Sequence, residues 1–189
     1  MDQVPGLQAA LEQAFELLAE GALQAGSPFH TPTLATSGPG APGLRTVVLR
    51  RFLPADRQVE FHTDARSPKM SAIAADPAVS LHFWDPGRRV QLHVHGLAAV
   101  LSRAAAAQIW RRLPPPTQAT YAVSLPPGTP IAAPADAARS LDPAAALAVF
   151  RAVRVGIDEL EWLHLAPGQH RRARVTWANG VAASTWLVP

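Results

Sequence analysis

The stretch LRTVVLRRFLPADRQVEFHTDARSPKM, residues 44–70, predicts a strand, a turn, a second strand and the start of a helix. Residues 44–52 are mainly apolar and β-branched apart from their arginines, which favours a buried strand. The segment PAD at 54–56 supplies a turn. Residues 58–63 then alternate polar and apolar side chains at the period of a half-buried strand. The segment SPK at 67–69 is typical of a helix start, with serine as the N-cap and proline as the first helical residue.

This order of elements predicts a phosphate site. It places Arg45, Thr63, Ser67 and Lys69 near the open amide groups of a helix N-terminus, a setting that suits a phosphate. Lys69 is the only lysine in the chain, against sixteen arginines, and a compact ammonium differs from a planar guanidinium as a phosphate ligand. A solvated lysine in the first turn of a helix explains Lys69 alone equally well. The prediction therefore depends on the whole group.

Composition and length indicate one globular domain over residues 1–189. The chain is 48% hydrophobic and 16% charged, which is typical of a folded protein. It contains no cysteine, which excludes disulfides, thiolate catalysis and cysteine-ligated metals. The sequence shows no signal or transit peptide and no apolar run of membrane-spanning length. We therefore expect a soluble, cytoplasmic protein that does not associate with membranes.

The charge pattern argues against nucleic-acid binding. The formal net charge is only +3, and the arginines occur in scattered pairs rather than in one basic run. A nucleic-acid-binding protein would be expected to show one basic face with interleaved aromatic residues. We expect no nucleic-acid partner and regard anionic small molecules as more natural ligands.

The rest of the chain predicts a mainly β protein with flanking helices, an α+β fold. In chain order the other expected elements are a helix over 6–25, a strand over 31–36 joined to the central stretch by a hairpin at 37–43, a helix from 68 that stops before 76, strands over 78–84 and 88–101, a helix over 103–113, and strands over 150–165, 169–177 and 184–189. Most links are of hairpin length, so six to eight antiparallel strands are expected to close into a small barrel. The chain contains no GxGxxG and no GxxxxGK[ST], so neither a Rossmann nor a P-loop site is supported.

A long segment rich in proline and alanine, residues 114–143, interrupts this pattern. At most short helices are expected within it. Loops of that length in compact domains are usually functional lids, partner-binding arms or disordered segments.

Five motifs resemble the pyridoxamine 5'-phosphate oxidase-like family in sequence and in order: RTVVLR (45–50), FHTDARSPK (61–69), RRVQLHVHG (88–96), EWLHL (161–165) and HRRAR (170–174). SPFHTPTLAT (27–36) and WLVP (186–189) are most similar to an uncharacterised FMN-binding branch of that family. The resemblance covers nearly the whole chain. It implies an antiparallel split β-barrel that binds FMN, with two FMN sites built across the interface of a homodimer.

The resemblance also implies which residues contact FMN. Arg45 and Lys69 match the phosphate-binding cations of the family, and Thr63 and Ser67 match its hydroxyl donors. Trp162 and Arg174 match positions contributed from the C-terminal strands, plausibly by a second subunit, although singly they could be a core residue and a solvated arginine. The full expected FMN-contacting set is Arg45, Val47, Val48, Arg50, His62, Thr63, Ser67, Lys69, Gln91, Trp162 and Arg174.

Departures from the family pattern concern the substrate. Arg171 matches a substrate-facing arginine of true pyridoxamine phosphate oxidases, but Ala173 stands where they have a histidine, and Arg50 stands where they have a lysine. Their cluster for the substrate phosphate is replaced here by Ile109, Leu113, Pro115 and Thr117. Since an apolar side chain cannot hold a phosphate dianion, we expect no vitamin B6 oxidation.

Three functions remain open from the sequence. The first is an FMN-dependent oxidoreductase acting on an unidentified small molecule, without an assigned catalytic residue. The second is a module that binds flavin, haem or a deazaflavin without turnover. The third is a metal site at His93 and His95, whose imidazoles suit Zn, Fe or Cu. A lone His-x-His pattern more often marks a polar barrel face, so no metal is expected.

Overall fold

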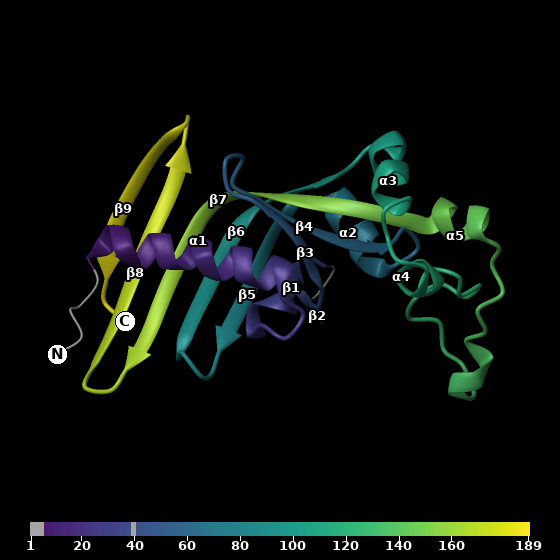
Figure 1. Cartoon of the computed structure of the whole chain (residues 1–189), viewed down its shortest axis with the longest axis horizontal. Coiled ribbons are helices and arrows are strands. Elements are labelled where there is room, and N and C mark those ends of the chain that lie inside the picture. The colour runs from purple at the N-terminus through teal and green to yellow at the C-terminus, as the bar shows by residue number, and fades with distance from the viewer. Residues whose placement is uncertain (1–5, 39–40) are drawn as a thin grey trace.

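The computed structural model describes residues 6–38 and 41–189. Within them, nine strands form one strongly curled antiparallel sheet (Figure 1). The strands are β1 (Thr33–Thr36), β2 (Gly43–Thr46), β3 (Leu49–Leu53), β4 (Gln58–Asp64), β5 (Ala78–Asp85), β6 (Val90–Val100), β7 (Phe150–Ala166), β8 (Gln169–Ala178) and β9 (Val181–Leu187). Seven of them follow the order β2-β1-β5-β6-β7-β4-β3, and β8 and β9 extend the sheet beyond the far half of β7.

The fold is an antiparallel split β-barrel. The two edge strands of the seven-strand path, β2 and β3, follow each other directly in the chain, so the chain itself crosses the gap between the two edges. Val47 still donates its amide hydrogen to the carbonyl of Pro32 beside β1, at 2.9 Å. Two residues later, Leu49 pairs with Phe61 of β4 on the other edge. The expected single strand over 44–52 is therefore wrong, since the chain crosses the gap at Val47 and Val48.

The strand count also corrects the expectation of six to eight. The interruption at Val47 and Val48 makes two strands where one was expected. The expected last strand over 184–189 begins earlier, as β9, and pairs with β8 along seven residues. The hairpin expected at 37–43 is present as the β1–β2 pair, but residues 39–40 at its tip lie outside the described residues.

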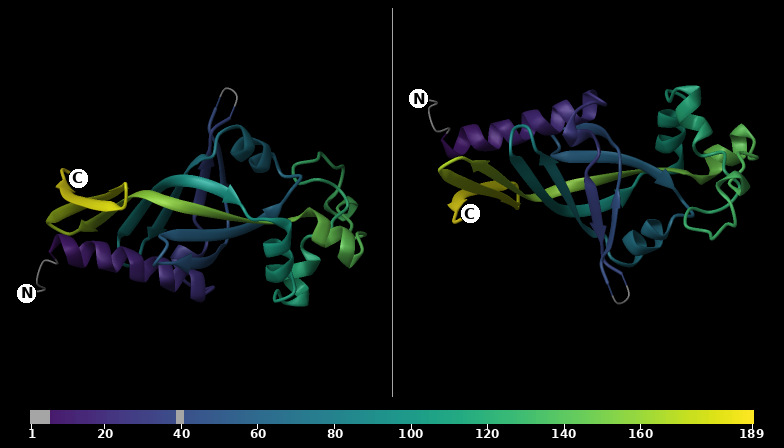
Figure 2. Two further views of the ribbon diagram at one scale, coloured as in Figure 1. Left: turned by 90° about the horizontal axis from the view of Figure 1, so that it is seen from above. Right: turned by 90° about the horizontal axis from the view of Figure 1, so that it is seen from below.

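The main core lies inside the curl and is sealed by helix α1 (Leu7–Leu23). Because side chains alternate across a strand, Phe83, Leu92 and Trp162 all point inward and are almost fully buried. Helix α1 runs along one side of the sheet, as Figure 2 shows, and buries Leu11 and Leu18 against it. The helix expected over 6–25 is confirmed within about two residues at each end.

A second, smaller core lies at the opposite end of the molecule from β8 and β9 (Figure 1). It joins helices α3 (Arg103–Trp110) and α5 (Pro143–Val149) to the start of β7. Phe150 packs against Trp110 and Tyr121, with ring centroids 5.3 and 5.1 Å apart. Residues 114–143, called the arm below, contain only α4 (Pro115–Ala119) and a short 3₁₀ turn. The expectation of at most short helices in this segment is confirmed.

The helix expected over 103–113 ends earlier, at Trp110, and a turn precedes Pro114. Helix α2 (Pro68–Ala75) begins and ends where the sequence predicted. None of the described helices is both long enough and apolar enough to cross a membrane.

Candidate phosphate and cofactor site

Lys69 lies in the first turn of α2, and its side chain folds back over the loop that precedes the helix. The amine donates hydrogen bonds to Oγ1 of Thr63 at 3.0 Å and to Oγ of Ser67 at 2.7 Å. Thr63 and Ser67 are both buried, at the end of β4 and at the N-cap of α2. The Ser67 side chain does not cap the helix but accepts from Lys69 instead. Two buried hydroxyls thus hold one ammonium in place.

Arg45 brings a second cation to this place from β2. Its Nη1 donates a hydrogen bond to Oγ1 of Thr36 at 2.7 Å, and Thr36 is buried in the neighbouring strand β1. The guanidinium lies against Gly43, where any Cβ would overlap it. Glycine at this position therefore makes room for the orientation of Arg45.

The electrostatics of the two cations indicate a site for an anion. Burial lowers the pKa of Lys69, and the positive charge of Arg45 lowers it further, while Asp64 acts weakly in the other direction. Burial also lowers the pKa of Arg45. Among the described residues neither cation forms a salt bridge, and Asp64, the carboxylate that acts on Lys69, is paired with Arg66 at 2.6 Å. An anion bound here would relieve the repulsion, and the N-terminus of α2 adds the positive end of a helix dipole.

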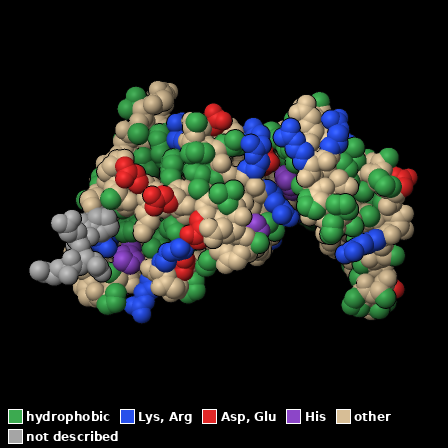
Figure 3. Space-filling view, viewed as in Figure 1, with side chains coloured by type: hydrophobic (Ala, Val, Ile, Leu, Met, Phe, Trp, Pro, Cys, Tyr) green, Lys and Arg blue, Asp and Glu red, His purple; other side chains and the backbone are tan. Residues whose placement is uncertain are grey.

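Four of the other expected residues lie at the crossing from β2 to β3 or on the neighbouring strands β3 and β4. Val47 is buried in the core at the crossing, and Val48 is half-buried. Arg50 in β3 has a buried Nε without a hydrogen-bond partner among the described residues. His62 has only 4% of its side chain exposed and lies 3.2 Å from Oε1 of Glu60. Figure 3 shows arginine and lysine side chains gathered where the barrel meets the helical end of the molecule.

The remaining expected residues lie elsewhere in this chain, towards the β7–β8 end of the sheet (Figure 1). Trp162 is 1% exposed and donates from Nε1 to Oε1 of Gln13 at 2.9 Å. Arg171 lies over the Trp162 ring at 5.7 Å and contacts Nδ1 of His164 at 2.9 Å. Gln91 and Arg174 project from the outer face of the sheet, in register with Trp84 and Glu161. One chain therefore brings together Arg45, Lys69 and the two hydroxyls of the expected phosphate site, but not these four residues.

Three histidines form a separate polar row on the outer face of β5 and β6. The rings of His82 and His95 lie 5.4 and 5.5 Å from the ring of His93. Burial lowers the pKa of His93, and its two histidine neighbours lower it further. The described residues contain no group of three or more metal-ligating side chains placed to hold an ion. The row is better described as a polar sheet face.

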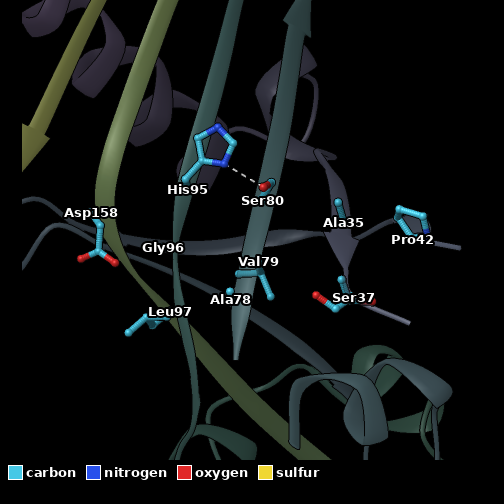
Figure 4. A pocket seen from close by; sticks show the side chains of 11 residues that line it. Ala35, Ser37, Pro42, Ala78, Val79, Ser80, His95, Gly96, Leu97 and Asp158 are labelled. Carbon is cyan, nitrogen blue, oxygen red and sulfur yellow. Dashed lines mark hydrogen bonds between the residues drawn. The ribbon is translucent and has the colours of Figure 1, made fainter. Parts of the chain in front are cut away.

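A hollow of about 510 Å³ beside this row is lined by Ser80, His95 and Asp158, the residue types of a catalytic triad. Ser80 and His95 point toward each other, with 2.8 Å between Oγ and Nδ1 (Figure 4). The carboxylate of Asp158 points away from the imidazole in the same view. Since no carboxylate of the described residues bonds the His95 ring, the geometry does not support a serine nucleophile.

Two residues at the phosphate site escaped the sequence prediction. Thr36 orients Arg45, but in the sequence it is one of several threonines in an expected strand. Arg66 pairs with Asp64 and also bonds the arm, at the carbonyls of Val123 and Ser124. Only the three-dimensional contact between segments 57 residues apart reveals the second role.

Comparison with known proteins identifies the class. Residues 8–102, just over half of the 189, match the family described as "Pyridoxamine 5'-phosphate oxidase, FMN-binding domain". The chain therefore belongs to this family. No curated protein sequence matches it closely enough to count as a relative.

Solved structures agree on the fold. A pyridoxamine 5'-phosphate oxidase-related, FMN binding protein from Nostoc punctiforme PCC 73102 is similar over 99% of this chain and 100% of its own, at 22% identity and a TM-score of 0.78. PhzG from Burkholderia lata 383, in complex with tetrahydrophenazine-1-carboxylic acid, is similar over 100% and 95%, at 21% identity and a TM-score of 0.76. A protein related to general stress protein 26, from Clostridium acetobutylicum, reaches a TM-score of 0.55 at 10% identity over 97% of both chains.

Proposed function

We propose that this protein binds FMN and holds the FMN phosphate between Lys69 and Arg45. The observation that supports the proposal is the pair of cations without a carboxylate partner among the described residues, held beside two buried hydroxyls. A phosphate dianion accepts charge-assisted hydrogen bonds from both cations and neutral ones from Thr63 and Ser67. The donor set therefore fits the phosphate of FMN, the cofactor after which the family is described.

The proposed activity is that of an oxidoreductase acting on a small molecule. Bound FMN would supply hydride and electron transfer, while the protein supplies position and electrostatics. Arg50 has a buried Nε free of any described partner, so its guanidinium is available to bind an anionic substrate. His62 lies almost fully buried next to Glu60 on the neighbouring strand β4.

We also propose that the functional unit is a homodimer. The expected flavin-contacting residues Gln91 and Arg174 lie on the outer face of the sheet, away from Lys69 and Arg45 of their own chain. The same end of the sheet exposes Trp84 and Trp186, at 37% and 43%. A second copy that covers this surface would complete the site, and we expect it to bury more than about 1,600 Å². A monomeric mass in solution with FMN bound would contradict the dimer.

The test of the phosphate assignment is Lys69→Ala, with the affinity for FMN compared with that for riboflavin, which lacks the phosphate. A lost charge-assisted hydrogen bond costs about 1.5–3 kcal/mol, so FMN binding should weaken about 10- to 150-fold. Riboflavin binding should barely change. Lys69→Arg is the matched control, since it keeps the charge. An unchanged ratio of FMN to riboflavin affinity in Lys69→Ala would refute the assignment.

Turnover is tested separately. Consumption of NAD(P)H or oxygen by the FMN-loaded protein would support an oxidoreductase, and its absence with a range of electron donors would favour a flavin-binding module. The visible spectrum of the protein as purified distinguishes flavin from haem or a deazaflavin.

A further inference from the structure

The segment from the end of β4 to the first turn of α2, residues 63–69, is called the phosphate loop here because it contains Thr63, Ser67 and Lys69. One residue of this loop, Arg66, bonds the arm. Its Nη1 donates to the carbonyl oxygen of Ser124 at 2.7 Å, and its Nη2 donates to that of Val123 at 2.8 Å. These two hydrogen bonds join the phosphate loop to the middle of the arm.

The same guanidinium holds the phosphate loop itself in shape. Its Nε and Nη2 donate to the carboxylate of Asp64 at 3.0 and 2.6 Å, and the amide of Arg66 donates to Oδ1 at 2.7 Å. The carboxylate directly follows Thr63, a hydroxyl partner of Lys69. One planar fork therefore fixes both the loop and the arm, which a flexible ammonium could not do with the same geometry.

Further contacts place the arm against the start of α2. The amide of Ala65 donates to the carbonyl of Val149 at 2.7 Å, at the end of α5, the helix that follows the arm. A Cβ placed on Gly128 would lie 4.0 Å from Cγ of Pro68, so this part of the arm passes near the first residue of α2. Both views in Figure 2 show the arm beside α2. The arm and the loop enclose a hollow of about 320 Å³, which Asp64 and Tyr121 help to line.

Tyr121 anchors the start of the arm in the second core, but residues 124–140 have little else to hold them in this position. Within the arm, Val123 and Arg139 form an isolated bridge, and Leu141 donates to the carbonyl of Ala122 at 2.9 Å. Most residues between 124 and 140 are exposed. A segment with few buried apolar contacts has a low local stability, so its order depends on a small number of polar contacts. The two Arg66 bonds are prominent among them.

We propose that Arg66 is a positioning residue that couples the order of the arm to the binding of a phosphate group at Lys69. The inference rests on the proposed function, since the phosphate group is that of FMN. An ordered arm fixes Arg66, Arg66 fixes Asp64 and the phosphate loop, and the fixed loop presents Thr63 and Lys69 to the phosphate. The coupling is reciprocal. If ordering of the arm raises FMN affinity by some factor, FMN binding raises the equilibrium constant for ordering the arm by the same factor.

Hydrogen exchange of the arm tests the proposal. Peptides covering residues 122–141 are followed by mass spectrometry without ligand, with FMN and with riboflavin. Arg66→Ala should speed exchange of the arm at least about tenfold without ligand and should remove most of the protection that FMN gives. FMN affinity should fall about tenfold, and riboflavin affinity should remain unchanged. Arg51→Ala, which removes an exposed arginine of β3, is the matched control and should behave as wild type.

A second variant separates tethering from charge. Removing Arg66 also leaves the Asp64 carboxylate unpaired near the incoming phosphate, which would weaken FMN binding by repulsion alone. In Asp64→Asn combined with Arg66→Ala this repulsion is absent. If the coupling holds, the arm of this double variant should exchange as fast as in Arg66→Ala, and FMN should remain weakly bound. Full recovery of FMN affinity while the arm still exchanges fast would overturn the coupling.

The remaining outcomes are also decisive. An arm that exchanges at the wild-type rate in Arg66→Ala overturns the tether, whether or not FMN binds. A faster arm with an unchanged ratio of FMN to riboflavin affinity overturns the coupling. Failure of the proposed function has a different signature: Lys69→Ala leaves that ratio intact, while Arg66→Ala still loosens the arm in the absence of ligand.

Discussion

The amine of Lys69 lies 3.0 Å from Oγ1 of Thr63, so the first turn of α2 is bonded to the last residues of β4. This contact directs the ammonium back over the phosphate loop rather than into solvent. It also partly buries the charge, which is the main reason that the pKa of Lys69 lies below its ordinary value of 10.5. The ammonium of Lys69 is therefore already oriented and partly desolvated before an anion binds.

The lowered pKa of Lys69 predicts how FMN binding responds to alkaline pH. Phosphate stabilises the ammonium, so the pKa is higher in the complex than in the free protein. Affinity is therefore full below the free-state pKa and falls by up to about tenfold per pH unit above it, until the pKa of the complex is reached. The fall should begin below pH 10.5.

The measurement is the ratio of FMN to riboflavin affinity across this range, because titration of the flavin ring affects both ligands. Lys69→Arg should keep the ratio constant, since a guanidinium stays protonated there. A wild-type ratio that stays flat up to pH 11 would contradict a role for Lys69.

Pyridoxamine 5'-phosphate should be a poor substrate. Ile109 and Leu113, which replace residue types that bind the substrate phosphate, pack against the second core around Trp110 and Phe150. An apolar wall offers a phosphate dianion no hydrogen bond and imposes a desolvation cost. Formation of pyridoxal 5'-phosphate by the FMN-loaded protein is the measurement. Efficient turnover would show that other residues bind the substrate phosphate.

Glu60 should stabilise the fold in a pH-dependent manner. Its carboxylate is fully buried; burial raises its pKa, but hydrogen bonds from His62 and Arg154 outweigh this and hold the pKa below the ordinary value. Glu60→Gln should lower the free energy of unfolding at pH 7 by about 1–3 kcal/mol. Because the folded pKa is depressed, this difference is present above the unfolded pKa of about 4.3 and is lost as the pH falls through the folded value.

Denaturant unfolding of both proteins between pH 7 and pH 3 tests this expectation. A stability difference that grows as the pH falls would have the wrong sign and would contradict the assigned ion pair.

Much of the barrel follows from sequence alone because its strands alternate polar and apolar residues and its links are short. The limits of β4, α2 and β5 agree with the predicted ranges to within about one residue. The split between β2 and β3 could not be predicted, since Leu44 to Phe52 is continuously strand-like. Only pairing with two different neighbours, β1 and β4, divides it.

The residues of the phosphate site were predictable in part for a similar reason. Thr63, Ser67 and Lys69 lie within seven residues, and a strand followed by a helix start brings them together by local geometry. The contacts of Thr36 and Arg66 depend on sheet pairing and on the path of the arm, which local patterns do not encode. A motif match has a limit of its own, which Trp162 illustrates. The motif places Trp162 in the expected flavin-contacting set, while in this chain it packs in the core and bonds Gln13.

The β6–β7 pairing, which positions the Gln91 and Trp162 strands, predicts a sharp contrast between two glycines. The register shifts between His95 and Gly96, and there a Cβ on Gly96 would overlap the backbone carbonyl of Gly156. No side-chain rotation can relieve a clash with backbone, so Gly96→Ala should destabilise the protein by about 3 kcal/mol, at the upper end of overpacking costs. A Cβ on Gly156 meets nothing within 4 Å, so Gly156→Ala should be nearly neutral. Denaturant midpoints of the two variants measure the contrast, and equal midpoints would show that the strands separate at the bulge without cost.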